Sequence, residues 1–113
     1  MNMKYILLSA ILLTIAGSAF TQQSPAEEVA ARIAGRMKDS LELTITVRDQ
    51  LYNVNLQLHD RKMAARQQYT EPEALRQSIQ QIENTRDSLY RIVLQDENKY
   101  FLYKQKKRNL IGN

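Results

Sequence analysis

The longest helical pattern in the chain opens with Leu41-Glu42-Leu43-Thr44-Ile45-Thr46-Val47 and continues through Leu51, Tyr52, Val54 and Asn55. It predicts the end of one helix near Leu41, a cap at Thr44 and the start of a second helix. No Pro or Gly occurs from Ile45 to Gln68. About 24 helical residues at 1.5 Å each predict a rod of roughly 36 Å.

This rod has apolar side chains on two faces. A narrow arc on one side contains Val47, Leu51, Val54, Leu58 and Ala65. A thinner second stripe, on nearly the opposite side, contains Ile45, Tyr52, Leu56 and Met63, and Arg48, His59 and Arg66 line one of its borders. A helix needs one apolar stripe for its own core, so the second stripe requires another partner.

Two further helices are predicted around the rod. Ser24, Pro25 and Glu27 form a helix-start signal, and the apolar residues that follow at helical spacing are Ala26, Val29, Ala30, Ile33 and Met37. Thr70-Glu71-Pro72-Glu73 repeats the start signal with Thr70 as the expected cap. The short break before it predicts an antiparallel hairpin of two long helices.

The helix after this break has an apolar face that consists of Leu75, Ile79, Ile82, Leu89 and Val93. Arg86 falls inside the face, where Leu would be expected, and Asp87 with Arg91 is expected to form a surface pair. Residues 95–98 predict a break before Tyr100-Phe101-Leu102-Tyr103, whose aromatics are expected to pack into the helical core while the neighbouring lysines stay solvated. No strand-length alternation occurs, so we expect an all-α fold of about four helices.

The N-terminus has the three parts of a secretory signal peptide. Lys4 precedes an apolar run from Tyr5 to Ala16, and small residues follow at cleavage spacing. Cleavage after Ala19 or Thr21 fits; we favour Thr21, which assigns residues 1–21 to the signal and 22–113 to one helical domain. The alternative is a retained N-terminal anchor helix. The expected location is therefore periplasmic or secreted.

Composition excludes several classes of function. The 113 residues allow one small domain, and the absence of cysteine excludes disulfides and acylation on Cys. The one histidine, His59, lacks neighbouring ligands for a metal site, and Ser40 and Ser88 lack a base nearby in sequence. We expect no enzyme activity, no catalytic residues, no metal and no cofactor.

The basic C-terminal segment has features of a binding surface. Tyr100, Phe101 and Tyr103 lie among lysines, a pattern that can stack nucleic-acid bases. An export signal argues against a nucleic-acid partner, and the net charge of +4 is small and dispersed. An amphipathic helix on a membrane surface is possible but less favoured.

The junctions between the helices resemble a known family. Leu43-Thr44 and the following Tyr52, Val54 and Asn55 are similar to the first repeat of the Spy/CpxP family of small periplasmic helical proteins, which carry an L-T-x-x-Q motif twice. Val47 stands where the first Gln is expected. At the second site Leu94 matches, while Gln95 replaces Thr and Asn98 replaces Gln.

The resemblance implies a four-helix, cradle-like protomer that dimerises through its long hairpin. It also implies ATP-independent chaperone activity toward unfolded envelope proteins on a mixed basic and apolar surface. The second stripe with its basic border has this mixture, and it also suits a homodimer seam; one stripe can serve both roles. The alternative functions are a non-enzymatic envelope stress regulator or sensor and a helical adaptor.

Overall fold

The computed structural model describes residues 23–112, and within this range the secondary structure is entirely helical. The helices are α2 (Pro25–Leu41), α3 (Ile45–Gln68), α4 (Pro72–Leu94) and α5 (Glu97–Lys107), and a short π-helical turn, η1 (Arg108–Gly112), follows α5. The predicted all-α fold with four helices is confirmed. The expected signal peptide and its cleavage site lie outside the described residues.

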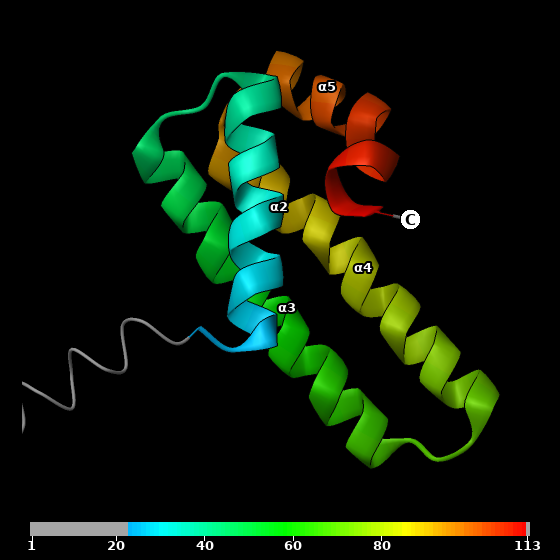
Figure 1. The fold of residues 1–113 in the computed structure, drawn as a ribbon. Helices are drawn as coiled ribbons and strands as arrows, with labels where there is room; N and C mark the ends of the chain where they lie inside the picture. Colours follow the sequence, from blue (N-terminus) through cyan, green and yellow to red (C-terminus); the bar gives the residue numbers. More distant parts are fainter. Residues whose placement is uncertain (1–22, 113) are drawn as a thin grey trace, which may run out of the picture.

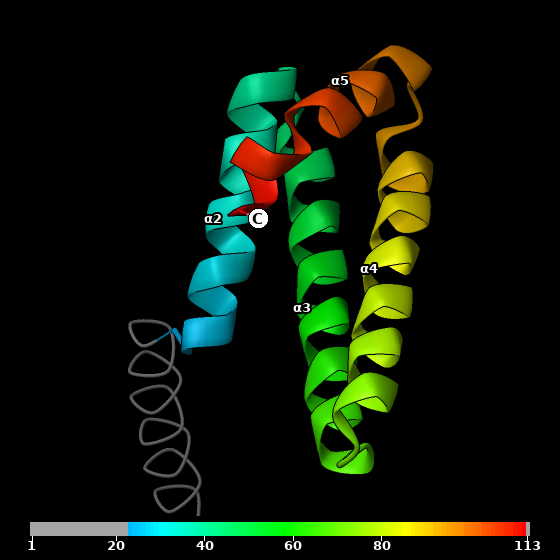
Figure 2. The same ribbon diagram turned by 90° about the vertical axis from the view of Figure 1, so that its right-hand side faces the viewer.

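α3 is the central element of the fold. It packs against α2 and against α4. α3 and α4 lie side by side and are joined by a short connection (Figures 1 and 2). α5 crosses from the end of α4 towards α2, and η1 then contacts α2 (Figure 2). The ends of α3 and α4 that this connection joins extend beyond α2 (Figure 1).

The sequence signals locate most helix ends correctly. The Ser24 side chain accepts a hydrogen bond from the Glu27 backbone N–H at 3.2 Å, and Glu27 accepts one from the Ser24 N–H at 3.1 Å, so the predicted capping box is present. Thr44 caps α3 by accepting from the Val47 N–H at 3.2 Å.

The predicted cap of α4 is wrong by one residue. Glu71, not Thr70, is the cap, and its carboxylate accepts from the backbone N–H groups of Glu73 and Ala74 at 3.0 and 2.7 Å. A carboxylate carries a full negative charge and can accept two bonds at the positive end of the helix dipole, which a hydroxyl cannot match.

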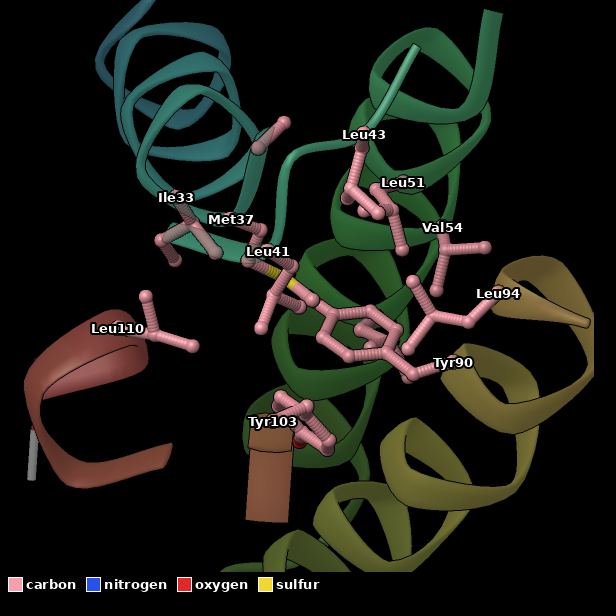
Figure 3. Close-up of a cluster of buried hydrophobic side chains, with 12 residues drawn as sticks. Ile33, Met37, Leu41, Leu43, Leu51, Val54, Tyr90, Leu94, Tyr103 and Leu110 are labelled. Carbon is pink, nitrogen blue, oxygen red and sulfur yellow. The ribbon is translucent and has the colours of Figure 1, made fainter. Parts of the chain in front are cut away.

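The hydrophobic core lies where the ends of α2, α3, α4 and α5 meet (Figure 3). α3 contributes the predicted stripe, with Leu51 and Leu58 fully buried. The other buried apolar residues of the core are Ile33, Ala34, Met37, Leu41, Leu43, Val54, Tyr90, Leu94, Tyr103 and Leu110. The core is therefore made by all four helices and by η1.

One predicted apolar face is displaced, and another differs in part. On α4 the predicted residues are half-buried, while Arg86, Tyr90 and Leu94 are the buried ones. On α2 the predicted Ala30, Ile33 and Met37 are buried, but Val29 is 42% exposed and Ala34 is buried as well. Periodicity locates an apolar stripe but not the exact line along which a neighbouring helix packs.

α5 buries one of its four consecutive bulky residues. Tyr103 is fully buried and packs edge-on against Tyr90, with 4.9 Å between ring centroids. Tyr100 is half-buried, whereas Phe101 is 60% exposed. The expectation that these aromatics pack into the core therefore holds for Tyr103 and partly for Tyr100, and is wrong for Phe101.

Candidate functional site

The second stripe of α3 and its basic border lie along one side of this helix, here called the α3 face. Its residues are Ile45, Arg48, Tyr52, Leu56, His59, Met63 and Arg66. Ile45 is 60% exposed and Met63 is 44% exposed, and Leu56 between them is half-buried. These three apolar side chains lie on one side of a helix that the core does not cover.

α2 covers one edge of the α3 face. The Tyr52 ring packs against the core cluster, and its hydroxyl donates a hydrogen bond to Glu27 Oε2 of α2 at 3.5 Å. Burial and the nearby Glu27 charge raise the pKa of Tyr52. His59, also half-buried, lines a small groove of about 260 Å³ together with Pro25, Ala26 and Val29 of α2. Tyr52 and His59 thus belong partly to the α2–α3 packing.

The basic border of the α3 face stays accessible to solvent. Arg48 pairs with its sequence neighbour Asp49 at 2.9 Å, and its side chain is 41% exposed. Arg66 is exposed and its guanidinium Nη1 lies 3.7 Å from the Met63 sulfur. Cationic groups therefore flank the apolar side chains at both ends of the helix.

The first motif lies at the α2–α3 junction. Leu43 is buried in the core, Thr44 caps α3 and Val47 is half-buried against the core. A Gln at the position of Val47 could bond back to the capping residue and complete a capping box. With Val47 the sequence keeps half of the box and gains an apolar contact.

The second motif lies at the α4–α5 junction but is shifted by one position from the expected alignment. Leu94 is buried, while Gln95 ends α4 in a left-handed conformation with φ of 51°. The cap of α5 is Asp96, which accepts from the Lys99 N–H at 3.1 Å. Asn98 is exposed in the first turn of α5.

The two junctions lie close together although they are far apart in sequence. The Lys99 ammonium of α5 donates to the carbonyl oxygen of Glu42 at 3.0 Å. Glu42 ends α2 in the same left-handed conformation, with φ of 54°. The two motif sites therefore meet at one end of the molecule, above the core.

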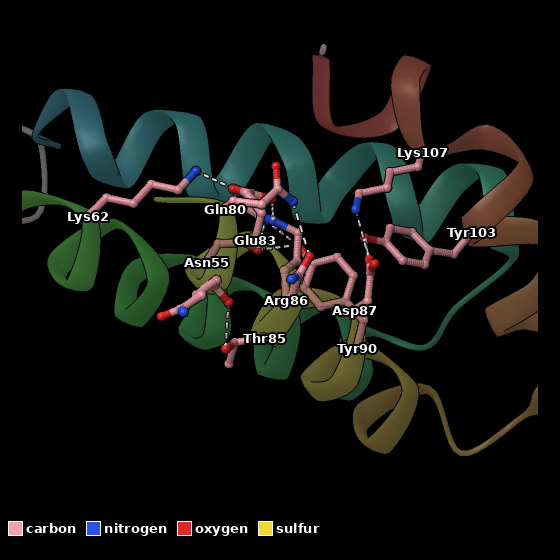
Figure 4. Close-up of polar contacts among 12 residues, drawn as sticks. Asn55, Lys62, Gln80, Glu83, Thr85, Arg86, Asp87, Tyr90, Tyr103 and Lys107 are labelled. Atoms are coloured by element: carbon pink, nitrogen blue, oxygen red, sulfur yellow. Dashed lines mark hydrogen bonds and ion pairs between the residues drawn. The ribbon is translucent and has the colours of Figure 1, made fainter. Parts of the chain in front are cut away.

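A buried polar cluster joins three helices below this end (Figure 4). Asn55 of α3 donates through Nδ2 to the Ala30 carbonyl of α2 at 3.0 Å. Its Oδ1 accepts from Arg86 Nη1 at 3.2 Å and from the Tyr90 hydroxyl, both on α4. Arg86 also donates to Tyr90 at 2.9 Å. One amide thus links α2, α3 and α4.

The charge of Arg86 is balanced by Glu83, one turn earlier on α4. The Arg86 Nε lies 2.9 Å from Glu83 Oε2, and Lys62 of α3 binds the same carboxylate. Burial opposes ionisation of Glu83, but the hydrogen bonds from Arg86 and Lys62 outweigh it and lower its pKa. Within residues 23–112, no buried side-chain nitrogen or oxygen lacks a hydrogen-bond partner.

A second polar cluster attaches α5 to α4, and it corrects the expected pair of Asp87 with Arg91. The Asp87 carboxylate accepts from the Tyr103 hydroxyl at 2.8 Å and from Lys107 Nζ at 2.9 Å (Figure 4). It also accepts from Lys104 Nζ at 2.8 Å. Arg91 instead pairs with Glu97 at 2.9 Å. Asp87 points towards α5, so a long-range contact replaces the local one.

The two clusters contain the residues that sequence reasoning missed. Arg86 gave a signal, because a charged residue stood inside an apolar stripe, but nothing in the sequence identifies Asn55 as its partner. Asp87 gave no signal beyond its local spacing to Arg91.

Across residues 23–112, His, Asp and Glu side chains do not gather in groups of three or more that would suit a metal ion. None of the helices in this range is long and apolar enough to cross a membrane.

Comparisons of the chain with protein-family models, with curated proteins and with solved structures give no significant match.

Proposed function

We propose that this protein is an exported, ATP-independent chaperone that holds unfolded polypeptides on the α3 face and prevents their aggregation. The observation on which the proposal rests is the exposure of Ile45 and Met63 beside Arg48 and Arg66. Apolar side chains that line one exposed side of a helix are typical of an interaction surface. The similarity of the helix junctions to the Spy/CpxP family supports the same function and a periplasmic location.

The chemistry of the α3 face suits weak binding of varied segments. Ile45 and Met63 are separated by 18 residues, or about 27 Å of helix, so the face is long and narrow. Met63 has a flexible, polarisable side chain that adapts to different apolar partners. The flanking arginines attract acidic segments and accelerate encounter.

The experiment that tests this function is an aggregation assay. A chemically denatured client protein is diluted into buffer with or without a stoichiometric amount of the purified protein, without nucleotide, and light scattering is followed. We expect the protein to reduce scattering. Unchanged scattering across several clients would contradict the proposal.

A matched pair of variants tests whether the α3 face is responsible. Replacing Ile45 and Met63 with Ser removes two exposed apolar groups from this face. The control replaces Ile92 of α4, which is 67% exposed, and Phe101 of α5, which is 60% exposed, with Ser. We expect the first variant to lose most of its protection and the control to keep it; equal loss in both would exclude a specific role for the α3 face.

A further inference from the structure

A second surface of the molecule has a different chemistry from the α3 face. A groove of about 990 Å³ is lined by residues of α2, α4, α5 and η1 and by Lys62 of α3. The elements that contribute these residues can be located in Figure 1. None of the α3-face residues lines this groove, and its size falls within the range of ligand-binding sites.

One side of the groove is strongly cationic. The charged residues that line it are Lys62, Glu83, Arg86, Lys104, Lys107 and Arg108. Glu83 is bound by Lys62 and Arg86, and Asp87 just outside the lining is bound by Lys104 and Lys107. Each carboxylate therefore meets two cations, and Arg108 forms no ion pair within the described residues. The groove has an excess of positive charge.

The two carboxylates lie one turn apart on α4. Glu83 and Asp87 are four residues apart, and side chains at this spacing lie on the same face of a helix. Lys62 of α3 reaches the first carboxylate, and Lys104 and Lys107 of α5 reach the second. Cations from other helices therefore gather along one face of α4.

The α2 side of the groove is apolar. The α2 residues that line it are Val29, which is 42% exposed, and the buried Ile33, and Ile111 of η1 also lines the groove. The groove thus combines cationic and apolar residues.

We propose that this groove binds an acidic segment of another protein that also carries apolar side chains. Gln105 and Asn109 supply amide donors and acceptors beside the cations. This interaction goes beyond the chaperone activity proposed above, because it uses a different surface and depends on a charge pattern that a general chaperone does not require.

The probe for the test is a fluorescein-labelled octapeptide of alternating Glu and Val, and binding is measured by fluorescence anisotropy with protein expressed from the full sequence. We expect saturable binding that weakens as salt is raised. Arg108→Glu is expected to weaken binding about fivefold. The matched control, Lys106→Glu, makes the same charge change on an exposed residue outside the groove and is expected to change the affinity less than about twofold.

Circular dichroism establishes that each variant keeps its helices. Gln105→Glu adds negative charge to the groove from α5 and provides a second variant, with an expected loss of about threefold. Three results would overturn the proposal: equal effects of Arg108→Glu and Lys106→Glu, equal binding of a peptide with Lys in place of Glu, or binding only to phosphatidylglycerol vesicles. The aggregation assay uses substitutions of Ile45 and Met63, whereas the peptide-binding assay uses substitutions in the groove. Failure of one proposal can therefore be distinguished from failure of the other.

Discussion

Among single residues, Asn55 makes buried hydrogen bonds to two other helices. Its amide donates to α2 and accepts from Arg86 and Tyr90 of α4, and the side chain is buried. A buried donor that loses its acceptor retains its full desolvation cost. The stability of the three-helix contact therefore depends on this one amide more than on any surface ion pair.

We expect Asn55→Leu to lower the free energy of unfolding by about 2–3 kcal/mol, because the Tyr90 hydroxyl and one Arg86 nitrogen lose their acceptor. Chemical denaturation followed by circular dichroism measures the change. Asn53→Leu is the matched control: Asn53 is exposed on the same helix, and its substitution should change stability by less than about 0.5 kcal/mol. Similar effects at both positions would show that the buried cluster is not important for stability.

Asp87 gives the attachment of α5 a defined pH dependence. Burial disfavours its charged form, but hydrogen bonds from Lys104, Lys107 and Tyr103 outweigh burial and place its pKa below the ordinary value of 3.8. A carboxylate with a depressed folded-state pKa stabilises the protein fully above the unfolded-state pKa. This stabilisation is lost as the pH falls through the folded-state pKa.

We expect Asp87→Asn to be about 2 kcal/mol less stable than the unmodified protein at pH 7. The difference should shrink as the pH falls from about 5 towards and below 3, because protonated Asp87 resembles the amide. Denaturation curves at several pH values test this. Glu83 titrates in both proteins, so its contribution cancels in the difference between their free energies of unfolding. A difference that stays constant with pH would contradict a lowered pKa for Asp87.

These residue contacts could not be predicted from the sequence. Asn55 and Arg86 are 31 positions apart, and Asp87 meets lysines 17 and 20 positions later. Helical periodicity places each side chain on a face of its own helix, but the partner depends on how the helices cross. The local expectation of Asp87 with Arg91 was wrong for this reason.

At the scale of elements, the helix ends were largely predictable because they depend on local chemistry. Ser24 with Pro25 and Glu27 fixed the start of α2, and Thr44 fixed the start of α3, as expected from capping preferences. The conformations at the other ends were not predictable, because Glu42 and Gln95 adopt positive φ without being glycine.

The left-handed conformation of Gln95 leads to a stability prediction. A non-glycine residue in this region is strained, and glycine is the residue most often found after a helix end. We expect Gln95→Gly to raise the free energy of unfolding by about 0.5–1 kcal/mol, measured by denaturation. Gln81→Gly, at an exposed position inside α4, should instead lower it by about 1 kcal/mol. Destabilisation by Gln95→Gly would mean that the Gln95 side chain makes a contact that compensates for the strain.

At the scale of the whole molecule, the position of α3 explains why one helix has two apolar faces. α2 and α4 cover the predicted core stripe, and α2 also reaches Tyr52 and His59 at the edge of the α3 face. Ile45 and Met63 stay exposed, and Leu56 stays half-buried. Sequence periodicity predicted both stripes; it did not predict that α2 would share part of the second one.

The remaining part of the α3 face suits a second copy of the chain as well as a client, and the two occupants would compete. We therefore expect the protein to form a homodimer at high concentration, with a mass by multi-angle light scattering twice that of one chain. Leu56→Lys places a charge at the centre of this face, and we expect it to give a monomer with unchanged helicity. Gln57→Lys, exposed on a different side of α3, is the control and should remain dimeric. If Leu56→Lys keeps the dimer mass, the dimer forms through another surface and the α3 face is left to the client alone.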